Sequence, residues 1–290
     1  MTRLLVTGGS GQLGLCFQTI ADEFPYYDLF FPTKNVVDLT RPKTLQTFYE
    51  SKPFDGIINC AAYTAVDHAE EKRDWADAMN SHSIQNLVEF IEVKKVFLIH
   101  FSTDYVFDGE INSSYREEDL TNPINTYGYS KREGELVLSS CKGRHTIFRT
   151  SWLFSPFGKN FVKTISKLSR EKKEIQVVND QRGKPTYGID LARMLLNNMN
   201  HPHFFDYKCY HYAQGSATTW YDFAQKIFAI IGASTQLEAV TSDHFPTVAL
   251  RPKNSILNTE RIEKTLSLKI PSWENALKRC LKRIQSNETI

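Results

Sequence analysis

Short apolar segments alternate with helical patterns through the first half of the chain. The clearest apolar segments are 3–7, 28–31, 56–62 and 96–103. Helical patterns begin near Gln12 and after Thr40, between the first three of these segments. This alternation predicts βαβ units, and the nearly uninterrupted apolar runs indicate parallel strands that are buried on both faces. Two further strand-like segments, 145–152 and 174–178, are expected to extend the same sheet.

The alternation loosens after about residue 152. Helical patterns separated by loops with Pro and Gly then follow at 161–173, 190–199, 220–231 and 273–284. We therefore predict an α/β protein with a doubly wound, Rossmann-like parallel sheet in residues 1–151 and a smaller, mainly helical lobe in residues 152–290. Segments near 174–197 and 208–214 are expected to return from the second lobe to the sheet.

Charge and cysteine content narrow the range of partners. The 35 basic and 33 acidic residues are well mixed and give a net charge of +2, so neither nucleic acid nor a membrane surface is an expected partner. No apolar run approaches the ~20 residues of a membrane span, and no basic, apolar leader precedes the first strand. The five cysteines lie far apart without a C-x-x-C spacing, which is typical of free thiols. These features predict a cytoplasmic protein.

A glycine-rich segment, TGGSGQLG at 7–14, follows the first strand and opens the first helix. It contains Gly9-x-Gly11-x-x-Gly14, and equally the wider spacing Gly8-x-x-Gly11-x-x-Gly14. Glycine allows a tight turn and lets backbone N–H groups approach a pyrophosphate at the positive end of a helix. The strand–turn–helix context therefore favours a dinucleotide site over a merely convenient turn.

The end of the second strand bears on the choice of cofactor. An acidic residue there would accept a hydrogen bond from the ribose of NAD, but this chain reads FFPTK at 30–34. Thr33 and Lys34 are available to a 2′-phosphate, so NADPH is favoured over NADH, with a solvated loop lysine as the alternative for Lys34. Asp38 and Leu39 follow closely and are expected to flank the adenine.

Two later segments supply candidate catalytic groups. The fourth strand ends in FSTDYVFDG, where alternation places Phe101 and Thr103 on one face, unless the Ser/Thr pair only stabilises the loop. In the helix of YGYSKREGE, Tyr127 and Lys131 are four residues apart and share a face, whereas Tyr129 points elsewhere. An ammonium beside Tyr127 would lower the pKa of its phenol by ~2 units and so make it a better proton donor.

The order of these motifs resembles the extended short-chain dehydrogenase/reductase family, and within it the dTDP-4-dehydrorhamnose reductases. The segments that carry the resemblance span essentially the whole chain: GQLG, CAAYTAVDHAE, STDYVFDG, NPINTYGYSKREGE, RTSWLF, GKNFVKT, VVNDQRGKPTY, YHYAQGSATTWYDFA, RPKNSILNT and PSWENALKR. The resemblance implies reduction of a 4-keto sugar nucleotide by NADPH or NADH in the synthesis of deoxysugar precursors for polysaccharide such as O-antigen. It also implies a cofactor-binding first lobe and a second lobe that binds the sugar nucleotide.

Site residues are carried over from the family position by position. Tyr127 would protonate the C4 oxygen, Lys131 would bind the nicotinamide ribose, and Thr103 would hydrogen-bond near the reacting oxygen. Asp104 and Trp152 match positions that contact the substrate. The expected cofactor-binding residues are Gly8, Gly11, Gln12, Leu13, Gly14, Asp38, Leu39, Ala61, Ala62, Tyr63, Thr64, Phe101, Tyr127 and Lys131. The candidates for the deoxythymidine diphosphate are Asn160, Arg182, Thr186 and Arg251.

The chain also departs from the family pattern. Some members dimerise around Mg²⁺ held by an acidic residue that directly follows the glycine turn, but this chain has Leu15 there, so no metal is expected and monomer or homodimer stays open. RTSWLFSPFG replaces the usual RTSWLYG, which leaves the accepted sugar open. A different sugar-nucleotide 4-reductase, epimerase or dehydratase is one alternative. A non-catalytic subunit resembling the methionine adenosyltransferase β subunit is another.

Overall fold

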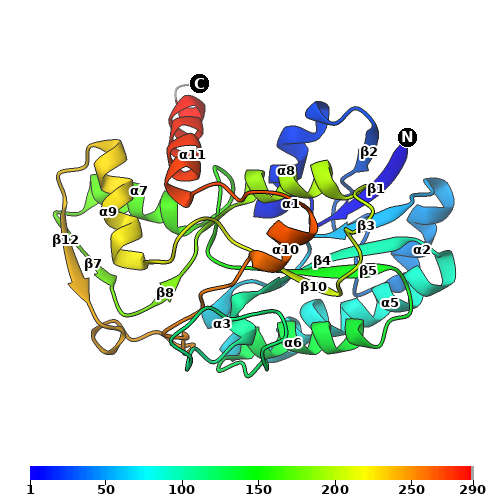
Figure 1. Ribbon diagram of the computed structural model, residues 1–290, viewed down its shortest axis with the longest axis horizontal. Coiled ribbons are helices and arrows are strands. Elements are labelled where there is room, and N and C mark those ends of the chain that lie inside the picture. Colours follow the sequence, from blue (N-terminus) through cyan, green and yellow to red (C-terminus); the bar gives the residue numbers. More distant parts are fainter. Residues whose placement is uncertain (289–290) are drawn as a thin grey trace.

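The computed structural model describes residues 1–288, and its centre is a six-stranded sheet in which every strand pair is parallel (Figure 1). The strand order is β10-β5-β4-β3-β1-β2. The bounds are β1 Thr2–Thr7, β2 Tyr27–Phe30, β3 Gly56–Asn59, β4 Phe97–Thr103, β5 His145–Thr150 and β10 Cys209–Tyr212. Leu4 and Val6 pack on one face of the sheet and Leu5 on the other, which explains why the apolar runs do not alternate.

Helices cover both faces of this sheet (Figure 1). α1 (Gln12–Ile20) and α8 (Gly188–Asn198) lie side by side on one face. The other face is covered by α2 (Pro42–Ser51), α5 (Ser83–Lys94) and α6 (Thr126–Ser139), whose apolar residues share one buried cluster with the strands. The predicted doubly wound, Rossmann-like α/β fold is therefore confirmed.

The remaining elements of the first half are short. They are α3 Val66–Glu71, α4 Arg73–Asp77, a π-helical turn Ala78–His82, and 3-10 turns at Ala21–Glu23 and Asp104–Val106. The π-helical turn contacts α6, and α6 in turn contacts β4. α6 itself begins where the side chain of Asn125 accepts a hydrogen bond from the backbone N–H of Gly128 at 2.8 Å.

The second lobe combines helices with three two-stranded sheets. Its helices are α7 Phe161–Glu171, α9 Trp220–Ile231, α10 Glu260–Thr265 and α11 Trp273–Glu288, with a 3-10 turn at Ser242–His244. Its strand pairs are β6 Leu153–Phe154 with β9 Thr186–Tyr187, β8 Arg182–Gly183 with β11 Thr218–Thr219, and β7 Glu174–Val178 with β12 Gln236–Val240. The helical patterns predicted from the sequence are all present in this lobe and in α8.

One strand prediction is wrong. The segment 174–178 forms β7 but does not extend the central sheet, because it pairs in parallel with Gln236–Val240 instead. Ile175 and Val177 are buried while their neighbours Glu174 and Gln176 are exposed. This strand therefore needs cover on one face only, unlike the strands of the central sheet. Part of the expected return to the sheet does occur, since β10 joins β5 and α8 packs on α1.

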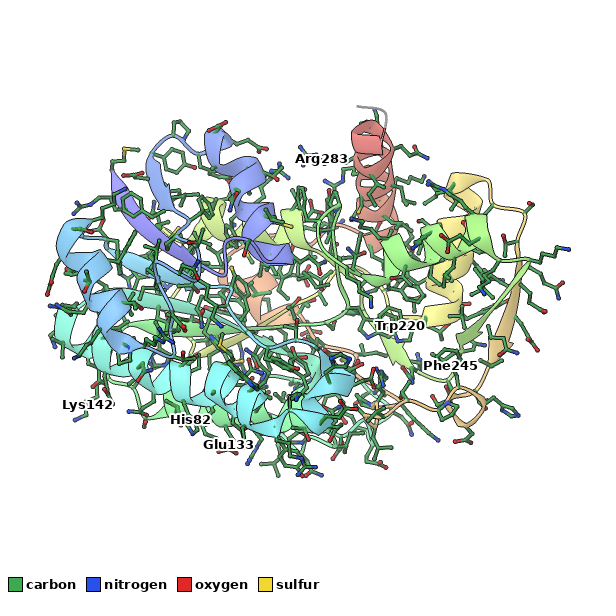
Figure 2. The ribbon with its side chains drawn as sticks, turned by 180° about the vertical axis from the view of Figure 1, so that it is seen from behind. His82, Glu133, Lys142, Trp220, Phe245 and Arg283 are labelled. Atoms are coloured by element: carbon green, nitrogen blue, oxygen red, sulfur yellow. The ribbon has the colours of Figure 1, made fainter. Side chains whose placement is uncertain are left out.

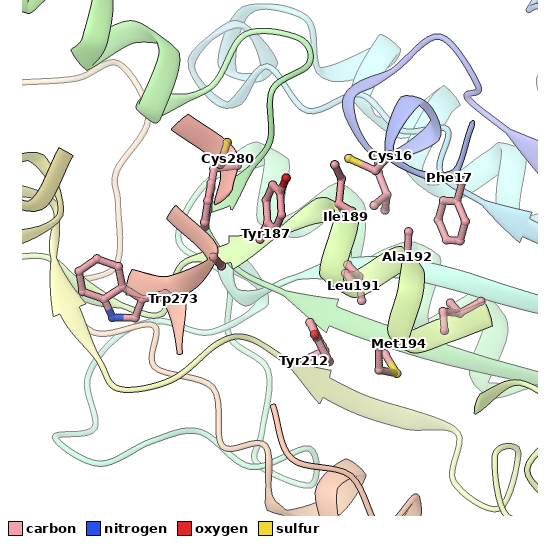
Figure 3. Packing of buried hydrophobic residues seen from close by; sticks show 14 of the residues in the cluster. Cys16, Phe17, Tyr187, Ile189, Leu191, Ala192, Met194, Tyr212, Trp273 and Cys280 are labelled. Carbon is pink, nitrogen blue, oxygen red and sulfur yellow. The ribbon is translucent and has the colours of Figure 1, made fainter. Parts of the chain in front are cut away.

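The two lobes share one hydrophobic core. A single cluster of buried residues extends from β1 and α1 through α8 to α9 and α11. Figure 3 shows Cys16 of α1 and Ile189 of α8 near Tyr187, with Cys280 and Trp273 of α11 beyond them. Among residues 1–288, no helix is both long enough and apolar enough to cross a membrane.

Candidate active site

A cavity of about 390 Å³ opens where β1, β3, β4 and β5 end and the second lobe begins. Ligands of open α/β sheets bind at this edge, outside the carboxyl ends of the strands. Eleven of the predicted site residues line it: Gly11, Gln12, Leu13, Ala62, Thr64, Phe101, Thr103, Asp104, Tyr127, Lys131 and Trp152. The structure thus brings residues from both lobes to one site.

The glycine turn closes one side of this cavity. Gly8 has φ +64°, and a Cβ there would lie 2.7 Å from the backbone nitrogen of Ala61. A Cβ on Gly14 would collide with the backbone oxygen of Gly8. Gly8 also accepts a hydrogen bond from the N–H of Gly11 at 2.9 Å, and α1 begins directly after Gly11. The turn therefore has the tight backbone and the exposed helix start that a pyrophosphate needs.

Some predicted cofactor residues lie outside the cavity lining. Asp38 accepts hydrogen bonds from the N–H and the hydroxyl of Thr40, at 3.0 and 2.7 Å, and these bonds lower the pKa of its carboxyl although burial opposes them. Leu39 is buried in the core on the α5 side of the sheet. The backbone N–H and C=O of Tyr63 are both bonded to the side chain of Asn80, each at 2.9 Å.

Tyr127 and Thr103 both line the cavity and lie within hydrogen-bond distance of each other. Tyr127 lines it and is half-buried, whereas Tyr129 is 51% exposed on another face of α6. Burial raises the pKa of Tyr127 above its ordinary value, and a hydrogen bond with the Thr103 side chain partly offsets this effect. The predicted lowering of the Tyr127 pKa is therefore wrong, because desolvation of the phenolate is the larger effect.

Lys131 is fully buried behind Tyr127. Its Nζ donates a hydrogen bond to the carbonyl oxygen of Phe101 at 2.7 Å and lies 3.2 Å from Nε2 of His100. Burial lowers the pKa of Lys131 to about 8, although the carboxylate of Glu135 acts in the opposite direction. The pKa of this lysine, which was predicted to act as an ammonium beside Tyr127, thus lies below its ordinary value.

Asp104 follows Thr103 at the floor of the cavity. Its Oδ1 accepts a hydrogen bond from the Thr103 hydroxyl at 3.1 Å, and burial raises the pKa of its carboxyl to about 7. Its Oδ2 and the hydroxyl of Ser102 are buried polar atoms without a hydrogen-bond partner in residues 1–288. Such groups beside a cavity suit a ligand that carries hydroxyl groups.

Two tryptophans form the wall on the second-lobe side. Trp152 lies just after β5 with φ +47°, and Trp220 begins α9 (Figure 2). Their rings are stacked, with centroids 3.6 Å apart and planes 7° from parallel. Gly183 leaves room for this arrangement, because a Cβ there would lie 2.5 Å from the Trp152 ring. Together the rings give the cavity an apolar, flat surface.

The four residues predicted for the diphosphate do not line the cavity. Asn160 caps α7 by accepting from the N–H of Lys163 at 3.3 Å, and Thr186 is fully buried in β9. Arg182 is exposed in β8. Arg251 forms a bidentate ion pair with Asp67, in which its nitrogens lie 3.0 and 2.7 Å from the two carboxylate oxygens.

Several residues that line the cavity were missed from the sequence. Asn59 and Thr150 end β3 and β5, so the rule that ligands lie at strand ends could have found them. Lys159 supplies a cation at the cavity edge, and Trp220 supplies the second indole. No local pattern marks either residue, because both reach the site only through packing of the second lobe.

A family model described as the RmlD substrate binding domain matches residues 1–286. The chain belongs to this family. An RmlD relative in Aggregatibacter actinomycetemcomitans, named dTDP-4-dehydrorhamnose reductase, is 36% identical over 287 residues, which cover 96% of this chain and 98% of that protein. The resemblance read from the motifs is therefore confirmed.

Solved structures of RmlD relatives match the whole fold. A dTDP-4-dehydrorhamnose reductase from Clostridium acetobutylicum superimposes with a TM-score of 0.92 at 34% identity, over 98% of this chain and all of that chain. A second, from Bacillus anthracis in complex with NADP, gives 0.91 at 36% identity with the same coverage. The RmlD fold thus includes both lobes of this chain.

The Mg²⁺ site of some family members has no counterpart among the described residues. Within 1–288, no group of three or more His, Cys, Asp or Glu side chains is placed to hold a metal ion. The first residue after the glycine turn is the apolar Leu15. The side chain of Leu15 cannot supply the oxygen ligand that Mg²⁺ prefers.

Proposed function

We propose that this protein reduces the 4-keto group of dTDP-4-dehydro-L-rhamnose to give dTDP-L-rhamnose. The observation that carries the proposal is the convergence of Thr103, Tyr127 and Lys131 on one cavity beside the glycine turn. Reduction of a ketone needs a hydride at carbon and a proton at oxygen. Bound NADPH would supply the hydride, and the chain itself has to supply the proton.

Tyr127 is the proposed proton donor. Its raised pKa keeps the phenol protonated at neutral pH, so the proton is held until the ketone oxygen gains negative charge. The hydroxyl of Thr103 would hydrogen-bond to the same oxygen and orient the carbonyl. Lys131 would contact the nicotinamide ribose through the one Nζ position that Phe101 and His100 leave open.

The glycine turn and the strand ends would hold NADPH. The backbone at Gly8, Gly11 and Gly14 would receive the pyrophosphate, with Gln12 and Leu13 at the start of α1 beside it. Lys34, whose Nζ lies 5.7 Å from the centroid of the Trp75 ring, remains the candidate for the 2′-phosphate. Asp38, Leu39 and the segment from Ala61 to Thr64 would surround the adenosine.

The second lobe would bind the dTDP-sugar. Trp152 stacked on Trp220 suits the apolar face of a deoxysugar, and the unpaired Oδ2 of Asp104 suits a sugar hydroxyl. Lys159 at the cavity edge is the nearest candidate cation for the diphosphate. We further propose a division into residues 1–151 for the cofactor and 152–290 for the sugar nucleotide.

The cellular location and the binding partners are inferred from the cysteines and the net charge. The five cysteines are all free, which suits a reducing compartment such as the cytoplasm. The nearly balanced charge supports a small-molecule partner rather than nucleic acid. We infer a cytoplasmic enzyme that acts as a monomer or a homodimer.

The test is to supply dTDP-4-dehydro-L-rhamnose with NADPH deuterated at C4 and to analyse the product. We expect one NADPH oxidised per sugar and deuterium at C4 of dTDP-L-rhamnose. An epimerase or a dehydratase would recycle its cofactor and leave NADPH unconsumed. A regulatory subunit would give no turnover with any sugar nucleotide, and either result would reject the proposal.

A further inference from the structure

The side chain of Gln12 extends from the glycine turn to the wall of the cavity. Gln12 is the first residue of α1, directly after Gly11, and it is half-buried. Its Nε2 donates a hydrogen bond to the backbone oxygen of Leu153 at 3.1 Å, although the two residues are 141 positions apart. A backbone oxygen can only accept, so the NH₂ group of the amide has to face it. The amide therefore joins the first lobe to β6, the strand that begins the second lobe.

The loop after β6 packs on the same side chain. Gly158 has φ +62°, and a Cβ there would lie 3.3 Å from the Cβ of Gln12, closer than most Cβ contacts. The side chain of Asn160 donates to the backbone oxygen of Ser155 at 2.9 Å, which fixes the beginning of this loop. The loop includes the residues in which this chain departs from the family pattern. Gln12 is thus held between the Leu153 carbonyl and a loop of the second lobe.

The backbone conformation of Trp152 depends on neighbouring contacts. Its φ of +47° is uncommon for a residue other than glycine, so surrounding groups have to hold it there. From the second lobe, the N–H of Thr186 donates to the oxygen of Trp152 at 3.2 Å, and the Trp220 ring stacks on the indole. From the first lobe, Gln12 binds the next carbonyl, that of Leu153. Two consecutive carbonyls are therefore fixed from the two lobes.

The cofactor does not require the side chain of Gln12. A pyrophosphate at a helix start is bound by backbone N–H groups, which any residue at this position supplies. We propose that Gln12 is a positioning residue for the sugar nucleotide, because its side chain holds the backbone on which the Trp152 indole forms the cavity wall. The effect on the sugar rests on the proposed function, in which Trp152 contacts the dTDP-sugar. The hold on Trp152 itself is a property of the protein without ligand.

Gln18 on the same helix provides a matched control. Its Nε2 donates to the backbone oxygen of Gly9 at 3.0 Å, so this amide bonds within the first lobe. Gln12→Met and Gln18→Met thus make the same chemical change, and each removes one hydrogen bond to a backbone oxygen. Gln12→Ala removes the Gln12 amide in a second way, without a long side chain that has to be repacked.

The first test is nuclear magnetic resonance of the protein labelled with ¹⁵N-tryptophan, without ligand. The chain has four tryptophans, and the indole N–H signal of Trp152 is assigned as the one that is lost in Trp152→Phe. We expect this signal to shift or broaden in Gln12→Met and in Gln12→Ala, because the indole is no longer fixed over the Trp220 ring. In Gln18→Met it should stay at its wild-type position. An unchanged Trp152 signal in both Gln12 variants would overturn the proposal.

The second test compares the steady-state constants for the dTDP-sugar and for NADPH. Loss of one hydrogen bond in Gln12→Met should raise the KM for the dTDP-sugar about fivefold, with kcat and the KM for NADPH close to wild type. Gln18→Met should leave the KM for the dTDP-sugar unchanged. A rise in the KM for NADPH alone would show that the Gln12 side chain serves the cofactor, and would reject the proposal. A wild type without turnover would reject the proposed function instead, and the indole spectra would still show whether Gln12 holds Trp152.

Discussion

The indole rings of Trp152 and Trp220 lie 3.6 Å apart and within 7° of parallel, although the two residues belong to different parts of the chain. Trp152 follows the last strand of the first half, and Trp220 begins a helix of the second lobe. This stack holds the start of the second lobe against α9 at the wall of the cavity. It makes the proposed sugar-binding surface dependent on Trp220, which lies outside the dinucleotide motifs.

We predict that Trp220→Ala raises the KM for the dTDP-sugar about fivefold and changes kcat little. The stack contributes about 1 kcal/mol beyond its buried area, and its loss frees Trp152 to leave its binding position. Steady-state kinetics with varied sugar nucleotide measures the effect. Phe245→Ala is the control, because Phe245 is an exposed aromatic of the same lobe outside the cavity lining. Equal KM values in Trp220→Ala and the control would show that the stack plays no part in binding.

A buried ion pair under the site provides a prediction about stability. Arg149 and Glu135 are each less than a tenth exposed, and their closest nitrogen and oxygen lie 2.7 Å apart. Arg149→Met should destabilise the protein by about 3–5 kcal/mol, because it leaves a carboxylate buried without its partner. Adding Glu135→Leu should recover part of this loss. Urea denaturation measures the free energies of unfolding.

The control for this pair is Lys264→Met, which removes a partner from the exposed pair between Lys264 and Glu260. Solvent screens that pair, so little change in the urea midpoint is expected. If Arg149→Met lowers the free energy of unfolding no more than Lys264→Met does, the buried pair does not stabilise the fold under the site.

Asp104 predicts a specific dependence of stability on pH. Burial raises the pKa of its carboxyl to about 7 in the folded protein, so between pH ~4 and about 7 the folded chain keeps a proton that the unfolded chain releases. Stability therefore falls as pH rises through this window, by on the order of 4 kcal/mol in total. Asp104→Asn lacks this titration, and its stability relative to wild type should increase from pH ~4 to about 8.

Asp108→Asn serves as the comparison for this pH series. Hydrogen bonds from Glu110, Tyr115 and Asn122 outweigh burial and lower the pKa of the Asp108 carboxyl. Its stabilising contribution is thus present above pH ~4 and lost below it, so no trend is expected between that pH and about 8. A flat difference for Asp104→Asn over the same range would contradict the assignment of a buried, protonated carboxyl.

Local spacing was enough to predict that the side chains of Tyr127 and Lys131 line the cavity. The separation of Tyr127 and Lys131 by four residues identified which of the two tyrosines faces the cavity, because that spacing places side chains on one face of a helix. The pKa of Tyr127 could not be predicted in this way. It depends on how deeply the phenol is buried and on Thr103 and Asp104, which lie outside the helix that carries the motif.

The one wrong strand prediction also arose because local sequence does not determine long-range packing. The segment 174–178 has the composition of a strand, but only its packing decides whether it joins the central sheet or pairs with Gln236–Val240. In the site, Arg251 was a candidate for the diphosphate because of its charge, and nothing in the sequence indicated that its guanidinium is paired with Asp67, far away in the chain. Local motifs predicted the chemical role of a side chain or the type of an element. Contacts between residues far apart in the chain decided which partners these side chains and strands have.

The most direct measurement compares NADPH oxidation by wild type and Tyr127→Phe, each supplied with dTDP-4-dehydro-L-rhamnose at saturation. Removal of the phenolic proton should lower kcat by about a hundredfold or more, while Tyr129→Phe, which alters the exposed tyrosine, should retain wild-type kcat. Wild-type kcat in Tyr127→Phe would contradict the account, because the proton would then come from another group.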